Sequence, residues 1–178
     1  MLKLVIVVLS LCYPFLVYWG LQHYDARMLL PVLLILLSLR WLVGDKTSER
    51  KIIIATLLGV VMIAFVWGYQ LGLKFYPVMM NLGFLILFAS SLISPPSVVE
   101  RLARVKEADL PEHVIAYTEK VTFVWSIFFF MNGSIAGFTA LYASEKTWML
   151  YNGFIAYILI GILAAAEWLI RQRVRRET

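Results

Sequence analysis

The stretch Ser94–Tyr142 organises the chain and reads SPPSVVERLARVKEADLPEHVIAYTEKVTFVWSIFFFMNGSIAGFTALY. It joins the only long polar segment of the sequence directly to a hydrophobic segment, residues 121–142, that carries Asn132, Gly133 and Gly137. About 20 apolar residues are enough for a helix to cross the hydrocarbon core of a bilayer. The stretch therefore predicts a membrane span preceded by a polar segment that lies outside the hydrocarbon.

The polar part of this stretch carries the signals of a short helix. Ser97 stands three residues before Glu100, which is the spacing of a capping box, and Pro95 and Pro96 block a helix that continues from upstream. Pro111 ends the segment, so we expect an amphipathic helix over residues 97–110. Such a helix rises roughly 18 Å, too little to cross about 30 Å of hydrocarbon. We expect it to lie on the cytoplasmic membrane surface; an ordinary solvated connector is the alternative.

The composition places the whole chain in lipid. Of the 178 residues, 62% are hydrophobic and 15% are charged, whereas soluble domains carry about 25% charged residues. The single Cys12 excludes a disulfide within the chain and a zinc site built from thiolates. His23 and His113 are predicted on opposite sides of the membrane, and no phosphate-binding or hydrolase motif is present. We expect no metal and no cofactor.

Hydropathy divides the chain into six spans within one transmembrane domain, residues 1–178. The fold class is therefore predicted to be all-α, a polytopic helix bundle with one short amphipathic helix. A turn is expected at residues 72–74, and Arg40 is expected to extend its side chain to the cytoplasmic interface. The predicted spans are residues 4–21, 28–43, 52–71, 75–93, 121–142 and 148–170.

The positive charges predict the orientation of these spans. Thirteen of the 16 Lys and Arg residues fall on the side of the N-terminus, and only Arg27, Lys74 and Lys146 fall on the other side. By the positive-inside rule, both termini are cytoplasmic. The basic residues flank spans instead of forming a patch, so topology explains the net charge of +5 better than a nucleic-acid partner does. Two WGxQ sequences, residues 19–22 and 67–70, are either a weak internal repeat or a chance match in aromatic-rich sequence.

Small and polar residues inside the predicted spans indicate helix packing or a binding cleft. Asn132 lies about 16 Å into its span at helical rise, near the bilayer centre. Gly133 and Gly137 form a GxxxG spacing beside it, and a short turn should pair spans five and six antiparallel through such faces. Asparagines here either join helices or line a polar ligand-binding cleft. The candidate packing set is Asn81, Asn132, Gly133, Gly137, Asn152, Gly153 and Glu167.

Two further predictions concern the cytoplasmic side. Glu167 precedes Arg171 by four residues, which favours a helical ion pair. A group of charged and aromatic residues near the same interface suits anionic lipid headgroups or a partner protein, although positive-inside anchoring explains its basic members equally well. This candidate headgroup set is Glu100, Arg101, Arg104, Tyr117, Lys120 and Trp125.

About half of the chain, residues 74–171, resembles a known group of proteins. The resemblance rests on Phe75-Tyr76-Pro77, Asn81, Ser90-Ser91-Leu92, Pro95-Pro96, Glu100 to Arg104, Tyr117, Lys120, Thr122, Trp125, Phe128 to Phe130, Asn132-Gly133, Trp148, Tyr151-Asn152-Gly153, Tyr157 and Glu167. These residues are similar to an uncharacterised family of small bacterial inner-membrane proteins, often encoded beside fatty-acid-like genes for aryl-polyene pigments. Trp125, Phe128-Phe129, Gly133 and Trp148 more distantly resemble intracellular septation protein A. An extra span and the absence of a lysine near Tyr151-Asn152-Gly153 depart from that protein. The resemblance implies a bacterial inner-membrane location but no catalytic residue.

Three functions fit these observations. The first is a non-enzymatic accessory or scaffold protein in envelope-lipid or aryl-polyene-lipid assembly, with membrane lipids and a membrane-protein partner or a second copy as partners. The second is a lipid or acyl-chain carrier or flippase, which requires Asn81, Asn132 and Asn152 to face one interior path. The third is a membrane enzyme acting on acyl lipids, which requires Glu100, Tyr117 and Lys120 to meet in one pocket.

Overall fold

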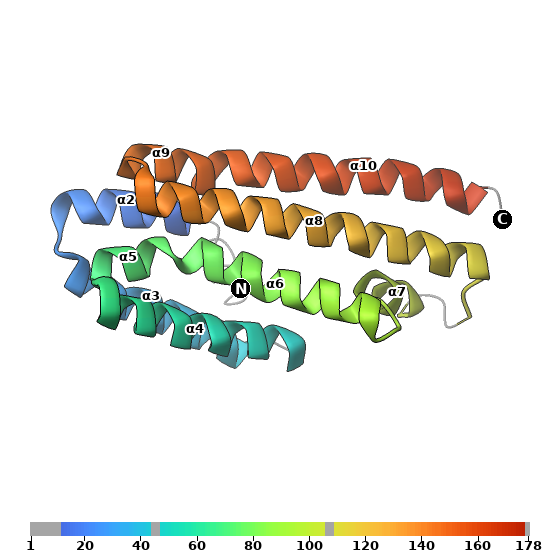
Figure 1. The fold of residues 1–178 in the computed structure, drawn as a ribbon, viewed down its shortest axis with the longest axis horizontal. Helices are drawn as coiled ribbons and strands as arrows, with labels where there is room; N and C mark the ends of the chain where they lie inside the picture. Colours follow the sequence, from blue (N-terminus) through green and yellow to red (C-terminus); the bar gives the residue numbers. More distant parts are fainter. Residues whose placement is uncertain (1–11, 44–46, 106–108, 177–178) are drawn as a thin grey trace.

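A computed structural model describes residues 12–43, 47–105 and 109–176 of the chain (Figure 1). Within these residues the regular structure is entirely helical, in agreement with the predicted class. The helices are α2 (Tyr13–His23), α3 (Ala26–Val43), α4 (Thr47–Trp67), α5 (Tyr69–Lys74), α6 (Tyr76–Ile93), α7 (Val98–Arg104), α8 (Glu112–Tyr142), α9 (Glu145–Leu150), the π-helical turn η1 (Tyr151–Ile155) and α10 (Ala156–Arg176).

Four of the described helical segments are long and apolar enough to cross a membrane. They are Arg50–Trp67, Tyr76–Ile93, Glu112–Tyr142 and Glu145–Gln172. The predicted first span extends into residues outside the described ranges, and α3 is not among the four. The protein therefore has the helices of a multi-pass membrane protein, while the count of six spans stays a prediction.

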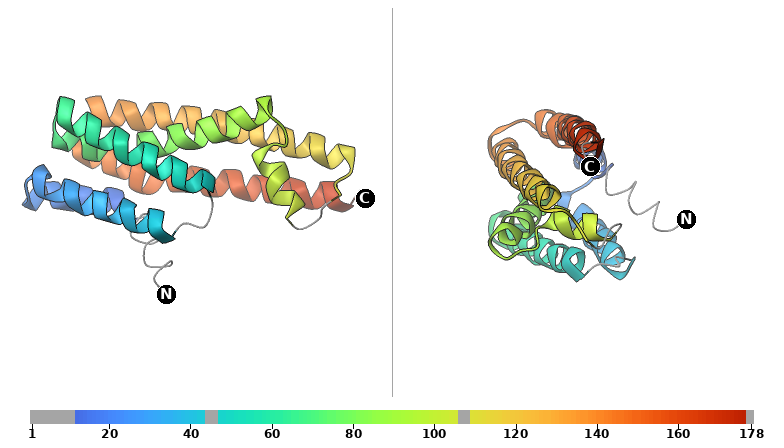
Figure 2. Two further views of the ribbon diagram at one scale, coloured as in Figure 1. Left: turned by 90° about the horizontal axis from the view of Figure 1, so that it is seen from below. Right: turned by 90° about the vertical axis from the view of Figure 1, so that its right-hand side faces the viewer.

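The helices form a bundle in which most neighbours in sequence are also neighbours in space. α8 lies beside α6, α6 beside α4, and α4 beside α3, while α2 contacts α3, α9 and η1 (Figure 2). The connections α2–α3 and α8–α9 lie at one end of the bundle, and α7 lies at the other (Figure 1). α8 and α10 continue well past the ends of α3 and α4 at the α7 end. The apolar core includes Tyr13, Leu33, Leu37, Ile53, Val60, Leu73 and Trp148.

The burial pattern is that of a helix bundle in lipid. Large apolar side chains point outward; Phe65 is 90% exposed and Ile93 is 85% exposed. The buried face of α8 instead consists of small and polar residues, namely Thr118, Thr122, Ser126, Asn132, Ala136, Thr139 and Ala140. Small residues let membrane helices approach closely, and hydroxyls can bond to their own helix. Thr122 and Ser126 do so, donating to carbonyl oxygens one turn earlier at 2.8 and 2.9 Å.

The turn between the predicted third and fourth spans lies earlier than the sequence suggested. α4 ends at Trp67, and Gly68 has φ +98° and ψ 155°, a conformation that is open essentially to glycine alone. α5 then folds back on α4, where a Cβ on Gly72 would come within 2.6 Å of Ala64 Cβ. The predicted span 52–71 and the predicted turn at residues 72–74 were therefore wrong there, because the backbone reverses at Gly68. The span at residues 75–93 matches α6 to within one residue.

The start of the polar helix is confirmed, but its length is not. Ser97 caps α7 by accepting a hydrogen bond from the Glu100 N–H at 3.2 Å. α7 ends at Arg104, so the prediction of a helix over residues 97–110 was too long, and residues 106–108 lie outside the described ranges. α7 packs on the ends of α6 and α8, where Ser91 Oγ accepts from the Val98 N–H at 3.0 Å. The next helix, α8, begins at Glu112, whereas the predicted fifth span began at residue 121. The helix is therefore longer than the predicted span at its N-terminal end.

A cluster of side chains fastens α9 to α2 and α5 at the opposite end of the bundle. The Glu145 carboxylate accepts hydrogen bonds from Gln22 Nε2 at 3.1 Å and from Gln70 Nε2. Lys74 Nζ lies 3.9 Å from the same carboxylate, and its side chain is 9% exposed. The two glutamines are the last residues of the two WGxQ sequences. Both therefore bind the Glu145 carboxylate, Gln22 from α2 and Gln70 from α5.

The reversal at Gly68 predicts a specific effect of replacing this glycine. Gly68→Ala should lower the free energy of unfolding by about 1–3 kcal/mol, because φ +98° is strained for any residue with a Cβ. Nothing lies within 4 Å of the added methyl group, so crowding plays no part. Thermal unfolding in detergent measures the change. Gly161→Ala, in helical backbone with equally open space, is the matched control and should be neutral or stabilising. Equal stability of the two variants would contradict the role of Gly68.

The Glu145 cluster predicts a coupled pair of substitutions. Glu145→Ala should destabilise the protein by about 1–3 kcal/mol, because it leaves Lys74 buried without its carboxylate. In a Lys74→Met background, the same substitution should cost clearly less, since the buried charge is gone. A double-mutant cycle measured by chemical denaturation gives the coupling. Glu119→Ala, an exposed acid on α8, should change stability by less than about 0.5 kcal/mol. Purely additive effects of Glu145→Ala and Lys74→Met would refute the coupling.

Candidate functional site: an intramembrane cavity

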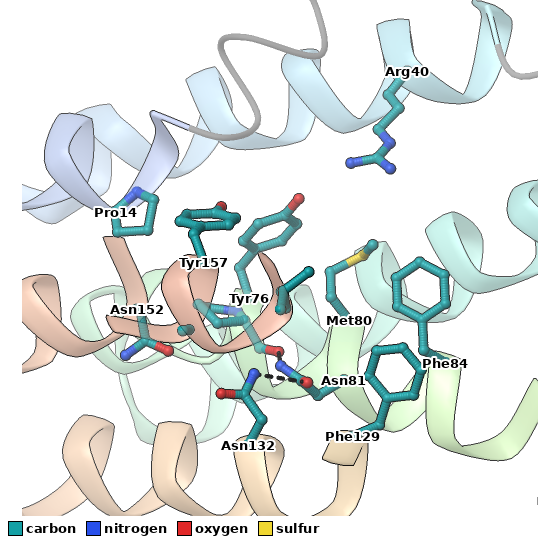
Figure 3. A pocket seen from close by; sticks show the side chains of 13 residues that line it. Pro14, Arg40, Tyr76, Met80, Asn81, Phe84, Phe129, Asn132, Asn152 and Tyr157 are labelled. Atoms are coloured by element: carbon teal, nitrogen blue, oxygen red, sulfur yellow. Dashed lines mark hydrogen bonds between the residues drawn. The ribbon is translucent and has the colours of Figure 1, made fainter. Parts of the chain in front are cut away.

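Three asparagines from separate helical segments meet at one cavity in the bundle. Asn81 comes from α6, Asn132 from α8 and Asn152 from η1, and all three line a cavity of about 220 Å³ (Figure 3). Asn132 and Asn152 are each 5% exposed. The structure thus shows the convergence that the carrier hypothesis requires of these three side chains.

A chain of hydrogen bonds fixes two of these amides. Asn132 Nδ2 donates to Asn81 Oδ1 at 3.0 Å, and Asn81 Nδ2 donates to the Pro77 carbonyl oxygen at 2.8 Å (Figure 3). The Tyr151 hydroxyl donates to Asn132 Oδ1 at 2.8 Å. Because each amide is held from both of its ends, the wall of the cavity carries amide groups in fixed positions.

Asn152 is held separately, by bonds that depend on the π-helical turn. Its Nδ2 donates to the Trp148 carbonyl oxygen at 2.9 Å and to Thr139 Oγ1 at 3.3 Å. Tyr151, Asn152 and Gly153 are all buried, although they are consecutive. Single π-helical turns inside helices are rare and are frequent at functional sites. Here the turn directs Tyr151 and Asn152 toward α8 together.

Arg40 adds a positive charge to the cavity. Its guanidinium points from α3 into the space that Tyr76, Asn81 and Tyr157 also line (Figure 3). Its charge interacts with the Tyr76 hydroxyl group. Arg40 therefore lines the cavity together with Asn132, while its extension to the cytoplasmic interface stays a prediction.

The remaining wall of the cavity is apolar and aromatic. Phe129 stacks on Phe84 with ring centroids 5.2 Å apart, and Met80, Ala156 and Ile160 complete this side. Sites that enclose a drug-sized ligand measure about 300–1,000 Å³. The cavity of about 220 Å³ is smaller, so it has room for the polar group of an amphipathic molecule and the first part of a chain.

Gly133, Gly137 and Gly153 pack against other helices than the sequence predicted. A Cβ on Gly133 would lie 3.0 Å from Asn81 Cβ, and a Cβ on Gly137 would lie 3.9 Å from Val78, so both glycines face α6. A Cβ on Gly153 would meet the Phe15 ring of α2 at 2.9 Å. The expected glycine-mediated contact between spans five and six was therefore wrong. α6 lies against α8 along its length, and α10 touches α8 little.

The candidate headgroup residues separate into two groups. Glu100 is 4% exposed. Its Oε1 atom accepts a hydrogen bond from Arg104 Nε at 2.8 Å and forms an ion pair with Arg104 Nη2, also at 2.8 Å. Arg101 Nε donates to the Pro96 carbonyl oxygen at 2.7 Å. These three residues stabilise α7 and its connection to α6.

Tyr117, Lys120 and Trp125 lie on α8 instead, where they line a cleft of about 290 Å³ with Glu167 of α10. The Tyr117 hydroxyl donates to the Glu167 carbonyl oxygen at 3.1 Å. The predicted ion pair of Glu167 with Arg171 is present at 4.0 Å. Glu100 does not line this cleft with Tyr117 and Lys120.

Besides its apolar wall, the cavity contains three polar residues that the sequence did not predict there: Arg40, Tyr76 and Tyr157. Arg40 carried a usable signal, since an arginine within an apolar segment marks a functional site more often than an anchor. Tyr76 resembled an interfacial aromatic residue and Tyr157 a member of a packing stripe along the last span, and no local pattern distinguishes such residues from cavity walls. Among the described residues, no group of three or more His, Cys, Asp or Glu side chains could hold a metal ion.

Comparison of the chain with models of protein families, with curated proteins and with solved structures finds no match. The geometry of the cavity is therefore the basis of the functional argument.

The hydrogen-bonded amides predict a moderate cost for losing Asn132. Asn132→Leu removes the bonds with Asn81 and Tyr151 and should destabilise the protein by about 1–2 kcal/mol, the scale of interhelical hydrogen bonds in membranes. Chemical denaturation in detergent measures this change. Ser134→Ala is the control on the same helix, since exposed Ser134 bonds only to Phe130 of its own helix. It should change stability by less than about 0.5 kcal/mol. Equal effects would contradict the interhelical role of Asn132.

Proposed function

We propose that this protein is a membrane-embedded lipid-handling protein that holds the polar group of an amphipathic molecule in the cavity. The observation that carries this proposal is the convergence of Asn81, Asn132 and Asn152 on one space between helices that have the length and apolarity of membrane spans. Amide groups offer both donors and acceptors, so they can bind a headgroup without charge matching.

The shape of the cavity supports a ligand with two chemically different ends. Polar groups from α6, α8 and η1 line the cavity, and the apolar side chains of Phe84, Phe129 and Ile160 line it beside them. Binding pockets commonly combine an apolar lining with a few placed polar groups that fix orientation. A lipid or an acyl-chain derivative presents this pair of surfaces, with its chain extending between helices toward the bilayer.

The second candidate is the accessory or scaffold function. It is favoured by the fact that every described buried side-chain nitrogen or oxygen atom has a hydrogen-bond partner within the protein. Asparagines that are satisfied in this way can serve helix packing alone. The two candidates differ in one respect that can be measured, namely whether the cavity contains a ligand in the purified protein.

The cellular setting belongs to the same proposal. The resemblance to bacterial inner-membrane proteins suggests the inner membrane of a bacterium, and the distribution of basic residues supports cytoplasmic termini. Both candidates are non-enzymatic. Envelope-lipid or aryl-polyene-lipid assembly would supply ligands of the required amphipathic kind.

Filling the cavity tests the proposed function. Ala156 is 6% exposed and lines the cavity, so Ala156→Phe should place a ring where the ligand's polar group binds. Native mass spectrometry of the full chain, extracted gently with its own lipids, should show a specific amphipathic molecule on the parent protein. That molecule should be reduced at least about tenfold in the variant, because a filled site cannot hold it.

Controls separate this result from misfolding. Ala165→Phe adds the same ring to an exposed position of α10 and should retain the molecule. Ile160→Phe fills the cavity by a smaller volume and should reduce occupancy if Ala156→Phe fails to assemble. A parent protein that carries only bulk lipid, with no species lost on filling the cavity, would overturn the lipid-handling function and favour the scaffold.

A further inference from the structure

Both hydrogens of the Asn152 amide are used within the protein. Nδ2 donates to the Trp148 carbonyl oxygen at 2.9 Å and to Thr139 Oγ1 at 3.3 Å, and an amide nitrogen carries two hydrogens. Thr139 Oγ1 itself donates to the Ala136 carbonyl oxygen at 3.0 Å, so it acts as the acceptor toward Asn152. These bonds fix the orientation of the amide group, because its nitrogen must face the two acceptors. The amide oxygen therefore faces the other way.

This oxygen has no partner, although its side chain is buried. None of the described residues donates a hydrogen bond to Asn152 Oδ1. Every fully enclosed side-chain nitrogen or oxygen atom of the described residues has a partner, so Oδ1 must lie at an accessible surface. Asn152 is 5% exposed and lines the cavity, so that surface is the wall of the cavity. Figure 3 shows the amide with its oxygen on the side of Asn132 and its nitrogen on the far side.

Two neighbouring amides provide the complementary groups. Asn132 Nδ2 donates to Asn81 Oδ1, and Asn81 Nδ2 donates to the Pro77 carbonyl oxygen, so each nitrogen uses one of its two hydrogens. Neither nitrogen makes a further bond with the described residues. Both side chains line the cavity. The cavity thus combines an acceptor that lacks a donor with N–H groups that lack an acceptor.

A hydroxyl group matches this combination, whereas an ionised acid does not. A hydroxyl donates one hydrogen bond and also accepts, so it can bind both kinds of group at once. An ionised carboxylate has no hydrogen to donate, so it would leave Asn152 Oδ1 unpaired and bring two acceptors together. A buried acceptor that loses its donor costs more than an average hydrogen bond contributes. The Asn152 oxygen therefore selects a ligand that carries a donor.

We propose that the cavity binds the hydroxyl end of an uncharged amphiphile, an alcohol that donates a hydrogen bond to Asn152 Oδ1. The same hydroxyl accepts from an amide N–H of Asn81 or Asn132. Phe129 and Ile160, which line the cavity beside these groups, contact the first carbons of the chain. This inference rests on the proposed lipid-handling function and adds to it the chemical class of the ligand's polar group.

Matched ligands test the inference. The full chain is immobilised in detergent and loaded with tritiated dodecanol, which unlabelled competitors then displace. Dodecyl methyl ether has the same chain and an oxygen but no hydrogen to donate, so dodecanol should displace the label at a concentration about five- to tenfold lower, the scale of one hydrogen bond. Dodecanoate, in a separate arm, tests whether the charge of Arg40, which also lines the cavity, selects an anion instead.

Two substitutions around one amide separate recognition from structure. Asn152→Ala removes the oxygen and should abolish the preference for the alcohol over the ether. Thr139→Val removes a bond on the nitrogen side and leaves the oxygen in place, so it should retain the preference. If Asn152→Ala fails to assemble, Asn152→Ser replaces it, because a helical serine can donate to the carbonyl oxygen one turn earlier, as Ser126 does, and lacks the amide oxygen.

Each result decides one point. Equal displacement by dodecanol and its ether, a preference that survives in Asn152→Ala, or an equal loss in Thr139→Val would overturn the hydroxyl ligand. Stronger displacement by dodecanoate, or no saturable binding of dodecanol, would overturn it as well. All these results leave the lipid-handling function in place if native mass spectrometry shows a specific molecule that Ala156→Phe removes. Absence of that molecule would overturn the lipid-handling function and this inference together.

Discussion

The structure depends on one constraint: every buried backbone carbonyl group needs a hydrogen-bond donor. Two carbonyl groups at the break between α5 and α6 show how this constraint is met. Pro77 has no N–H, so the Leu73 carbonyl oxygen has no partner in the normal helical pattern, and Leu73 is fully buried, away from water. The Tyr13 hydroxyl of α2 donates to this oxygen at 2.9 Å, and Trp148 Nε1 of α9 donates to the neighbouring Lys74 oxygen at 3.1 Å. Satisfying one broken helix therefore draws three separate parts of the chain together.

The same constraint shapes the cavity. Polar side chains that enter the bundle find partners on other helices, as Asn132 does with Asn81 and Tyr151. These bonds fix the amides at the wall, and the neighbouring aromatic side chains provide apolar surface. Arg40 belongs to this polar wall through Tyr76. The groups that hold the helices together are thus also the groups that face the space between them, which connects the architecture with the proposed binding of a ligand.

Features that depend on neighbouring residues in the chain were predictable from the sequence. The limits of α6 were found to within one residue, since a run of apolar residues starts and stops there, and the cap at Ser97 was found because it involves only the next turn. The Glu167–Arg171 pair follows from helical spacing alone. The reversal at Gly68 was missed because glycine is also common inside membrane helices, so its sequence context does not reveal a positive φ.

The sequence by itself determined that the chain forms apolar helices of membrane-spanning length and which polar residues they carry. It did not determine which helices are neighbours. Gly133 faces α6 and not the last span, and Arg40 lines a cavity together with Asn81 and Asn132. Only the tertiary structure decided these points. The apolar faces of the helices are similar in hydropathy, so neighbouring helices are selected by packing and by hydrogen bonds between residues far apart in the chain.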